Sequence, residues 1–216
     1  MATVHLIDDD ASLRAALGRL LSAAGYDVRS YAAAGDYLVP DPDDEPGCLL
    51  LDLLLPGTSG LELQAALRRH PAYERPIVFL SGAADVSTSV QAMRAGAREF
   101  LTKPVDGDTL LAAIKDAIEY DNVLRAQRKR VRIAREQIAS LNGREHKVLA
   151  GIVAGKLNKQ IAADLGVCER TVKGDRASIM RHLGVRTLLD LLKRVIEANH
   201  AEEEDATVPR SGQSGH

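Results

Sequence analysis

Hydrophobic positions along the first 120 residues follow two alternating patterns. Short runs that are apolar throughout, or that alternate apolar with polar residues, are separated by stretches in which apolar residues recur every three or four positions. The first pattern is typical of strands and the second of amphipathic helices. Strands are predicted at 3–8, 26–31, 48–52, 76–81 and 98–101, and helices at 12–24, 33–38, 61–69, 86–95 and from Asp106 onwards. This alternation predicts an α/β fold, a doubly wound five-stranded parallel sheet covered on both faces.

Polar residues of complementary chemistry stand at the carboxyl ends of these strands. Asp8 and Asp9 follow the first strand, Asp52 ends the third, Ser81 ends the fourth, and Lys103 follows the fifth. Ligands of doubly wound sheets bind beyond these strand ends. Two like charges about 4 Å apart repel by about 4 kcal/mol at an effective dielectric of 20, so clustered carboxylates need a cation. Mg²⁺ is the usual choice where a phosphate is also bound.

An ionised Asp52 beside such a cation is a nucleophile towards a phosphoryl donor. Attack gives an acyl phosphate whose charge Lys103 and the cation offset, and Ser81 is placed to donate a hydrogen bond to it. A single aspartate at a strand end more often caps a helix, the role we assign to Asp10. Four strand ends with complementary groups favour a phosphoacceptor site instead.

The chain from Asp106 to Asn142 predicts one long helix. Nine of its positions are spaced alternately four and three residues apart, which is the heptad spacing of a coiled coil. They are Ala113, Ala117, Tyr120, Leu124, Gln127, Val131, Ala134, Ile138 and Leu141. Two alternatives stay open: a linker helix that pairs with a second copy, which the spacing favours, and a single solvated helix, because Tyr120 and Gln127 are poor core residues.

Four shorter helical patterns follow Gly143. The second and third of them are joined by the tight turn Gly166–Cys168, which predicts a helix-turn-helix within a small all-α domain. Basic and polar side chains at its entrance and on its second helix suit phosphates or base edges. The candidate nucleic-acid contacts are Lys156, Asn158, Lys159, Arg170, Thr171, Lys173 and Arg176.

Composition and charge narrow the class of protein. The 216 residues are 45% hydrophobic, enough for a core, and no apolar run approaches the roughly 18 residues of a membrane span. Two cysteines far apart give no disulfide framework, and the chain start lacks a signal pattern, so we expect a soluble protein of the cytoplasm with no membrane partner. Net charge is −8 over 1–120, +4 over 121–140, +5 over 141–199 and −3 over 200–216. This division predicts two domains, the second facing a polyanion.

Five motifs in the first half resemble the receiver domain of response regulators. They are Leu6–Asp9, Leu50–Asp52, Pro56-Gly57 with Gly60, Phe79–Gly82 and Phe100–Pro104. The resemblance implies a flavodoxin-like receiver over residues 1–120, with a cis peptide bond between Lys103 and Pro104.

The same resemblance implies the role of each residue at the site. Asp52 is then the phosphoacceptor, and Lys103 pairs with the phosphoryl group. Asp8, Asp9, Asp52 and the backbone carbonyl of Leu54 would surround Mg²⁺. Ser81 and Phe100 would form a switch, in which the hydroxyl moves towards the phosphoryl group and the aromatic ring turns inward.

Five motifs in the second half are similar to the LuxR-type helix-turn-helix. They are Leu141–Glu145, Val148-Leu149, Asn158–Ala162, Arg170–Lys173, and Ile179-Met180 with Leu183–Val185. With a receiver in front, the chain resembles the NarL/FixJ class of transcriptional regulators. That class implies a sensor histidine kinase as phosphoryl donor, promoter DNA as ligand and a homodimer on phosphorylation. We therefore expect a regulator and no enzyme, with a linker at 121–140, the DNA-binding domain at 141–199 and a disordered acidic tail at 200–216.

The recognition helix departs from the LuxR-type pattern. Gly174 and Asp175 replace an apolar residue and a histidine, Ala177 replaces a basic residue of some relatives, and Cys168 replaces the usual capping serine. If Asp175 faces the groove it repels phosphate, so Asp175→His would raise non-specific DNA affinity. These departures leave open a receiver that acts by protein contact with weakened DNA binding.

A further alternative is a phosphatase of the haloacid dehalogenase type. Asp8 would be its nucleophile, and Ser81 and Lys103 superficially fit the scheme. The chain, however, lacks the cap domain of such phosphatases. This interpretation also leaves Asp52 and the entire second half without a role.

Overall fold

The computed structural model describes residues 1–38, 45–69, 75–82 and 86–206, with the backbone alone for 200–206. It divides into two compact units, Met1–Arg125 and Ala126–His216. Within the described ranges, no helix combines the length and the apolar character that crossing a membrane requires.

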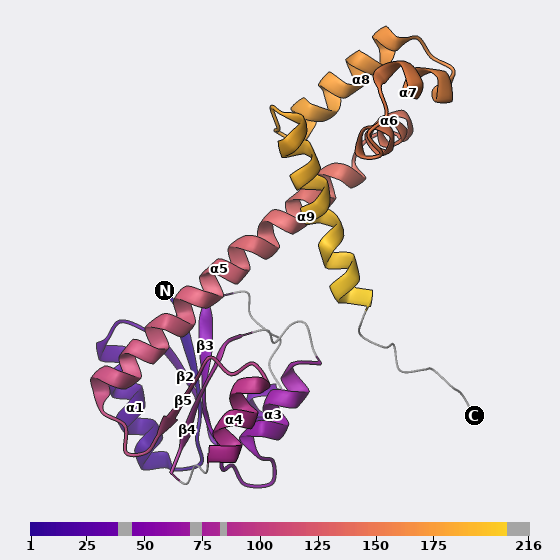
Figure 1. The fold of residues 1–216 in the computed structure, drawn as a ribbon. Helices are drawn as coiled ribbons and strands as arrows, with labels where there is room; N and C mark the ends of the chain where they lie inside the picture. The colour runs from indigo at the N-terminus through magenta and orange to yellow at the C-terminus, as the bar shows by residue number, and fades with distance from the viewer. Residues whose placement is uncertain (39–44, 70–74, 83–85, 207–216) are drawn as a thin grey trace, which may run out of the picture. The chain divides into compact units, whose positions relative to one another are not determined.

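The first unit is built on one parallel sheet with the strand order β2-β1-β3-β4-β5 (Figure 1). Its elements are β1 Thr3–Ile7, α1 Ala11–Ala23, β2 Asp27–Tyr31, α2 Ala34–Leu38, β3 Gly47–Asp52, α3 Gly60–Leu67, β4 Ile77–Ser81, α4 Val86–Arg94, β5 Glu99–Thr102 and the long helix α5 Gly107–Ala139. The predicted doubly wound sheet is confirmed, and each predicted strand is present to within one residue at either end. Residues 39–44, between α2 and β3, lie outside the described residues.

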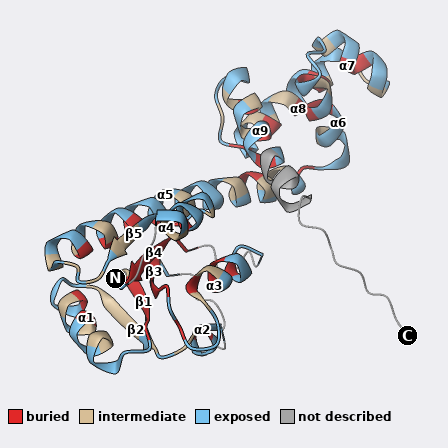
Figure 2. Cartoon of the chain, turned by 60° about the horizontal axis from the view of Figure 1, so that its bottom comes forward, coloured by how far each residue is buried: buried red, intermediate tan, exposed pale blue. Residues whose placement is uncertain are grey.

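Helices cover both faces of the sheet (Figure 1). Helices α1 and α5 pack with Val4, Leu6 and Leu50 on one face, while α2, α3 and α4 pack with Ile7 and Leu51 on the other. Every residue of β1, β3 and β4 is buried, which Figure 2 shows as the red centre of this unit. Burial on both faces is the reason that β3 and β4 read as apolar runs, whereas β1 also buries Thr3 and His5.

Helix α5 runs without interruption over 33 residues, as its pattern predicts. The predicted heptad stripe is occupied within the chain at both ends. Ala117 is fully buried in the core of the first unit, whereas Ala134 and Leu141 are buried in the second. Both ends of the stripe are therefore occupied within the chain. Tyr120 and Gln127 in its middle are exposed, and pairing of that part with a second copy stays a prediction.

The second unit contains four more helices around one hydrophobic core. They are α6 Gly143–Val153, α7 Asn158–Leu165, α8 Glu169–His182 and α9 Leu188–Ala206. The predicted helix-turn-helix is present: α7 ends at Gly166 in the left-handed conformation (φ +66°, ψ 30°), and α8 begins three residues later. Glycine adopts this conformation without the steric cost that a Cβ would add.

The segment predicted as a disordered tail, from residue 200, begins within a helix. Helix α9 continues to Ala206. Residues 201–204 are alanine and glutamate, which favour helix, and extending an existing helix is easier than nucleating one. Residues 207–216 lie outside the described residues.

Candidate functional site

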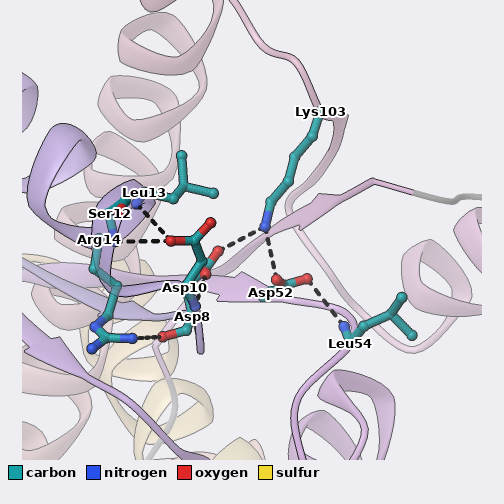
Figure 3. A network of polar contacts seen from close by, with 8 residues as sticks. All are labelled: Asp8, Asp10, Ser12, Leu13, Arg14, Asp52, Leu54 and Lys103. Carbon is teal, nitrogen blue, oxygen red and sulfur yellow. Dashed lines mark hydrogen bonds and ion pairs between the residues drawn. The ribbon is translucent and has the colours of Figure 1, made fainter.

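Three charged side chains meet at the carboxyl edge of the sheet. The Lys103 ammonium donates hydrogen bonds to Asp8 Oδ2 and to Asp52 Oδ2, each at 2.7 Å. Figure 3 shows the lysine reaching between the two aspartates from the segment after β5. The Asp8 side chain is fully buried and that of Asp52 is 8% exposed, so the lysine neutralises carboxylates that water barely reaches. The sequence prediction that these residues converge is confirmed in geometry.

The local backbone holds both carboxylates in place. Strands β1 and β3 are paired in parallel, which brings their carboxyl ends side by side. The amide of Asp10 donates to Asp8 Oδ1 at 2.9 Å, and the amide of Leu54 donates to Asp52 Oδ1 at 3.0 Å. Asp10 itself caps α1 by accepting from the amides of Ser12 and Leu13, which confirms its predicted capping role.

Asp9 completes an acidic cluster with Asp8 and Asp52. One oxygen from each of the three carboxylates lies within 4.8 Å of the others, and Asp9 is exposed. An all-oxygen donor set of this density fits a hard divalent cation. Burial lowers the pKa of Lys103, but its hydrogen bonds to Asp52 and Asp8 outweigh this and raise the pKa above its ordinary value. Lys103 therefore stays charged at neutral pH and offsets part of the acidic cluster.

Ser81 and Phe100 lie on the two strands next to this cluster. Ser81 is fully buried at the end of β4, and its carbonyl accepts a 2.7 Å hydrogen bond from the Lys103 amide. The Phe100 ring is partly buried, with its centroid 5.9 Å from that of Phe79. The peptide bond from Lys103 to Pro104 is cis, as the resemblance implies. The switching roles of Ser81 and Phe100 stay predictions, as does the part of the Leu54 carbonyl.

The candidate nucleic-acid contacts fall into two groups. Lys156, Lys159, Arg170 and Lys173 are exposed; Lys156 pairs with Asp164 at 2.7 Å, and Lys173 with Glu169 at 3.0 Å. Arg176, Asn158 and Thr171 are only partly exposed. Arg176 donates to Asn158 Oδ1 at 3.4 Å, which places both between α7 and α8, and Thr171 Oγ1 lies 3.2 Å from Cys168 Sγ. The first group is therefore better placed for DNA than the second.

The Asp175 side chain points towards α6, so the condition on which the predicted effect of Asp175→His depends, a carboxylate facing DNA, is not met. Its side chain is 11% exposed and receives two hydrogen bonds from Arg144, from Nε at 2.7 Å and from Nη2 at 2.9 Å. One turn further along α8, Ser178 donates to Glu145 Oε1 at 2.8 Å. Asp175 therefore holds α8 against the start of α6. The side-chain hydrogen bond to Asp175, followed by its charge, raises the pKa of Arg144.

Sequence reasoning missed three residues that the structure singles out. Arg144 is the partner of Asp175, 31 positions away, and no periodicity links the two. Arg181 is exposed on α8 seven residues after Gly174, a helical interval that could have placed it on the same face as Arg170. Asp121 is fully buried on α5 and accepts a 2.9 Å hydrogen bond from the Gly47 amide, a contact without any sequence signal.

The fold and site define a two-domain regulator, and comparison with known families gives the same result. The model described as "Response regulator receiver domain" matches residues 4–115, and that described as "Bacterial regulatory proteins, luxR family" matches residues 139–195. The chain therefore belongs to the response regulators of the NarL/FixJ class, which are DNA-binding two-component transcriptional regulators. Membership implies a histidine kinase and promoter DNA as partners.

Individual relatives match over nearly the whole chain. Nodulation protein W of Bradyrhizobium diazoefficiens is 36% identical over 94% of this chain and 90% of its own. Transcriptional regulatory protein FixJ of Azorhizobium caulinodans is also 36% identical, over 94% and 96%. Among solved structures, the response regulator StyR is 40% identical with a TM-score of 0.79, and covers 91% of this chain and 98% of its own. These matches leave the haloacid dehalogenase alternative without support.

Proposed function

We propose that Asp52 accepts a phosphoryl group from a sensor histidine kinase and that this modification promotes homodimerisation and promoter binding. The observation that carries the proposal is the pair of 2.7 Å contacts from Lys103 to the buried carboxylates of Asp8 and Asp52. An ionised, nearly buried carboxylate beside a fixed ammonium is prepared to attack phosphorus and to have its product stabilised.

In the transfer, an Asp52 oxygen forms a bond to phosphorus while the bond from phosphorus to the donor breaks. The Leu54 amide holds Asp52 Oδ1 at 3.0 Å, which leaves Oδ2, on the Lys103 side, as the nucleophile. The Lys103 ammonium then pairs with the negatively charged phosphoryl oxygens, and the Ser81 hydroxyl donates a hydrogen bond to one of them. Mg²⁺, held by Asp8, Asp9, Asp52 and the Leu54 carbonyl, would supply further charge neutralisation there.

Phosphorylation is read out by the second unit. We propose a receiver at 1–120, a linker at 121–140 and a DNA-binding domain at 141–199, acting in the cytoplasm where promoter DNA is found. The exposed side chains of Lys159, Arg170 and Lys173 support phosphate or base contacts. A dimer would bind two half-sites about 34 Å apart or a multiple of that distance.

The test is incubation of the full chain with acetyl phosphate and Mg²⁺, followed by intact mass and size-exclusion chromatography. Wild type is expected to gain one phosphoryl group and to shift towards a dimer. Asp52→Asn is expected to do neither, because an amide oxygen is a poor nucleophile. Labelling that survives in Asp52→Asn but is lost in Asp8→Asn would refute the assignment of the phosphoacceptor.

A further inference from the structure

Gly174 lies in the middle of α8, where the fold itself does not require glycine. Its φ is outside the positive range, unlike that of Gly166 in the preceding turn. A Cβ built at Gly174 would meet none of the described atoms within 4 Å. Glycine inside a helix is less stable than alanine, because it loses more backbone freedom on folding. Gly174 therefore lowers the stability of α8 without serving the packing of the chain. This indicates that a ligand outside the chain requires glycine here.

The exposed face of α8 has Gly174 at its centre. Arg170, Gly174, Ala177 and Arg181 follow one another at intervals of four, three and four residues, and all four are exposed. The opposite face is fixed by burial of Val172, Ile179 and Leu183 in the core.

Polar contacts on both flanks of α8 fix its rotation independently of the core. Asp175 is held by Arg144 of α6, and Arg176 contacts Asn158 of α7. Gly174 therefore lies on the outward side of α8, where a ligand of this face would bind.

The chemistry of the face indicates what approaches it. Arg170, Lys173 and Arg181 surround the glycine with positive charge, which suits the phosphates on both sides of a DNA groove. Gly174 and Ala177 themselves offer no side-chain donor or acceptor, and backbone groups in mid-helix are occupied by helix hydrogen bonds. The surface at this point can recognise only shape and apolar groups. In the major groove the apolar group that distinguishes bases is the thymine C5-methyl.

We propose that Gly174 lets the backbone of α8 lie closer to the base-pair edges than any side chain would permit, and that this close contact selects a thymine. The inference rests on the proposed DNA-binding face of α8. Base specificity would then come from Gly174, which has no side chain, whereas recognition of a base by side-chain hydrogen bonds would need a side chain at this position.

The experiment uses the full chain, treated with acetyl phosphate and Mg²⁺, and a pool of duplexes with a randomised central segment. The duplex that wild type enriches most is compared with the unselected pool. Gly174→Ala is expected to raise the melting temperature, yet to lose at least about fivefold of the preference for the enriched duplex, the lower range of one mismatched base pair. Replacing the critical thymine by deoxyuridine removes only a methyl and should weaken wild-type binding about fourfold.

Gly18→Ala is the matched control. Gly18 is also inside a helix, α1, with no positive φ and no described atom within 4 Å of a built Cβ. The Gly18→Ala substitution should therefore stabilise the protein as Gly174→Ala does, and leave the DNA sequence preference unchanged. A Gly174→Ala variant that keeps the full preference, or a wild type that enriches no sequence, would overturn the inference.

Lys173→Gln separates this inference from the proposed function. It should weaken binding to enriched and unselected duplexes alike and reduce the salt dependence by about one counterion. If Lys173→Gln has this effect and Gly174→Ala has none, the inference alone is wrong. If neither variant changes DNA binding, α8 does not form the DNA-binding face and both ideas are wrong.

Discussion

The surroundings of Asp175 determine what a substitution at this residue does. We predict that Asp175→Asn lowers the free energy of unfolding of the second unit by about 1 kcal/mol, because the amide offers the half-exposed Arg144 one acceptor instead of two and no negative charge. Non-specific DNA affinity should not rise, since the carboxylate points towards Arg144 and away from the exposed face. Urea denaturation and a salt titration of DNA binding measure the two effects.

Glu169→Gln is the control for that prediction on the same helix. Glu169 pairs with Lys173 at 3.0 Å, but both side chains are about half exposed, so its removal should change stability much less. Unchanged stability in Asp175→Asn, together with tighter binding to DNA, would show that Asp175 faces the DNA and does not stabilise the contact between α6 and α8.

Single residues differ in how far the sequence alone could place them. Asp8, Asp52 and Lys103 were predictable as a group, because parallel strands bring their carboxyl ends to one edge and each residue is tied to a strand end. Asp175 was not predictable. Its partner Arg144 belongs to a different helix, and the crossing of two helices brings together side chains that share no interval in the sequence.

Among the helices and strands, α5 and β3 are joined by a buried carboxylate. Asp121 Oδ2 accepts from the Gly47 amide at 2.9 Å and from Arg125 Nε at 2.6 Å. Burial, and then the negative charge of Asp121, raises the pKa of the Cys48 thiol to about 12. The end of α5 within the first unit is thereby attached to the start of the strand whose other end is Asp52.

We predict that Asp121→Ala lowers the free energy of unfolding of the first unit by about 2 kcal/mol, because it removes the acceptor of the buried Gly47 amide. Denaturant unfolding of the full chain measures the loss. Asp116→Ala is the control on the same helix: Asp116 pairs with Arg98 at the surface, and its removal should have little effect. Equal losses in the two variants would show that the Asp121 contact contributes nothing beyond an ordinary surface ion pair.

Helices and strands could be predicted from the sequence where one hydrophobic period runs through the whole element. They were harder to predict where an element extends from one packing environment into another. All five strands were placed to within one residue at either end. For β3 and β4 the signal is an apolar run buried on both faces, whereas β2 and β5 mix apolar with polar residues and are partly exposed. The heptad stripe of α5 spans two environments. Ala117 and Ala134 share its spacing, yet each is buried in a different unit. Similarly, α9 continues to Ala206, beyond its apolar pattern, because alanine and glutamate favour helix.

For the whole molecule, the division into two units predicts two separable unfolding transitions. The acidic cluster lies entirely in the first unit, and a ligand stabilises only the folded unit that binds it. Mg²⁺ at a hundredfold excess over its dissociation constant should therefore stabilise the first unit by about 2.7 kcal/mol and leave the second unchanged. Scanning calorimetry with and without Mg²⁺ measures both midpoints in one experiment.

Two substitutions identify the transitions independently of the metal. Asp121→Ala should lower only the transition that Mg²⁺ raises, and Asp175→Asn should lower only the other. Asp8→Asn should abolish the response to Mg²⁺, because it removes one of the three carboxylates that form the cluster. If Mg²⁺ raised both midpoints equally, the continuous helix α5 would have to transmit stability from one unit to the other. The chain would then unfold as a single cooperative body, and the independence of its two halves would be refuted.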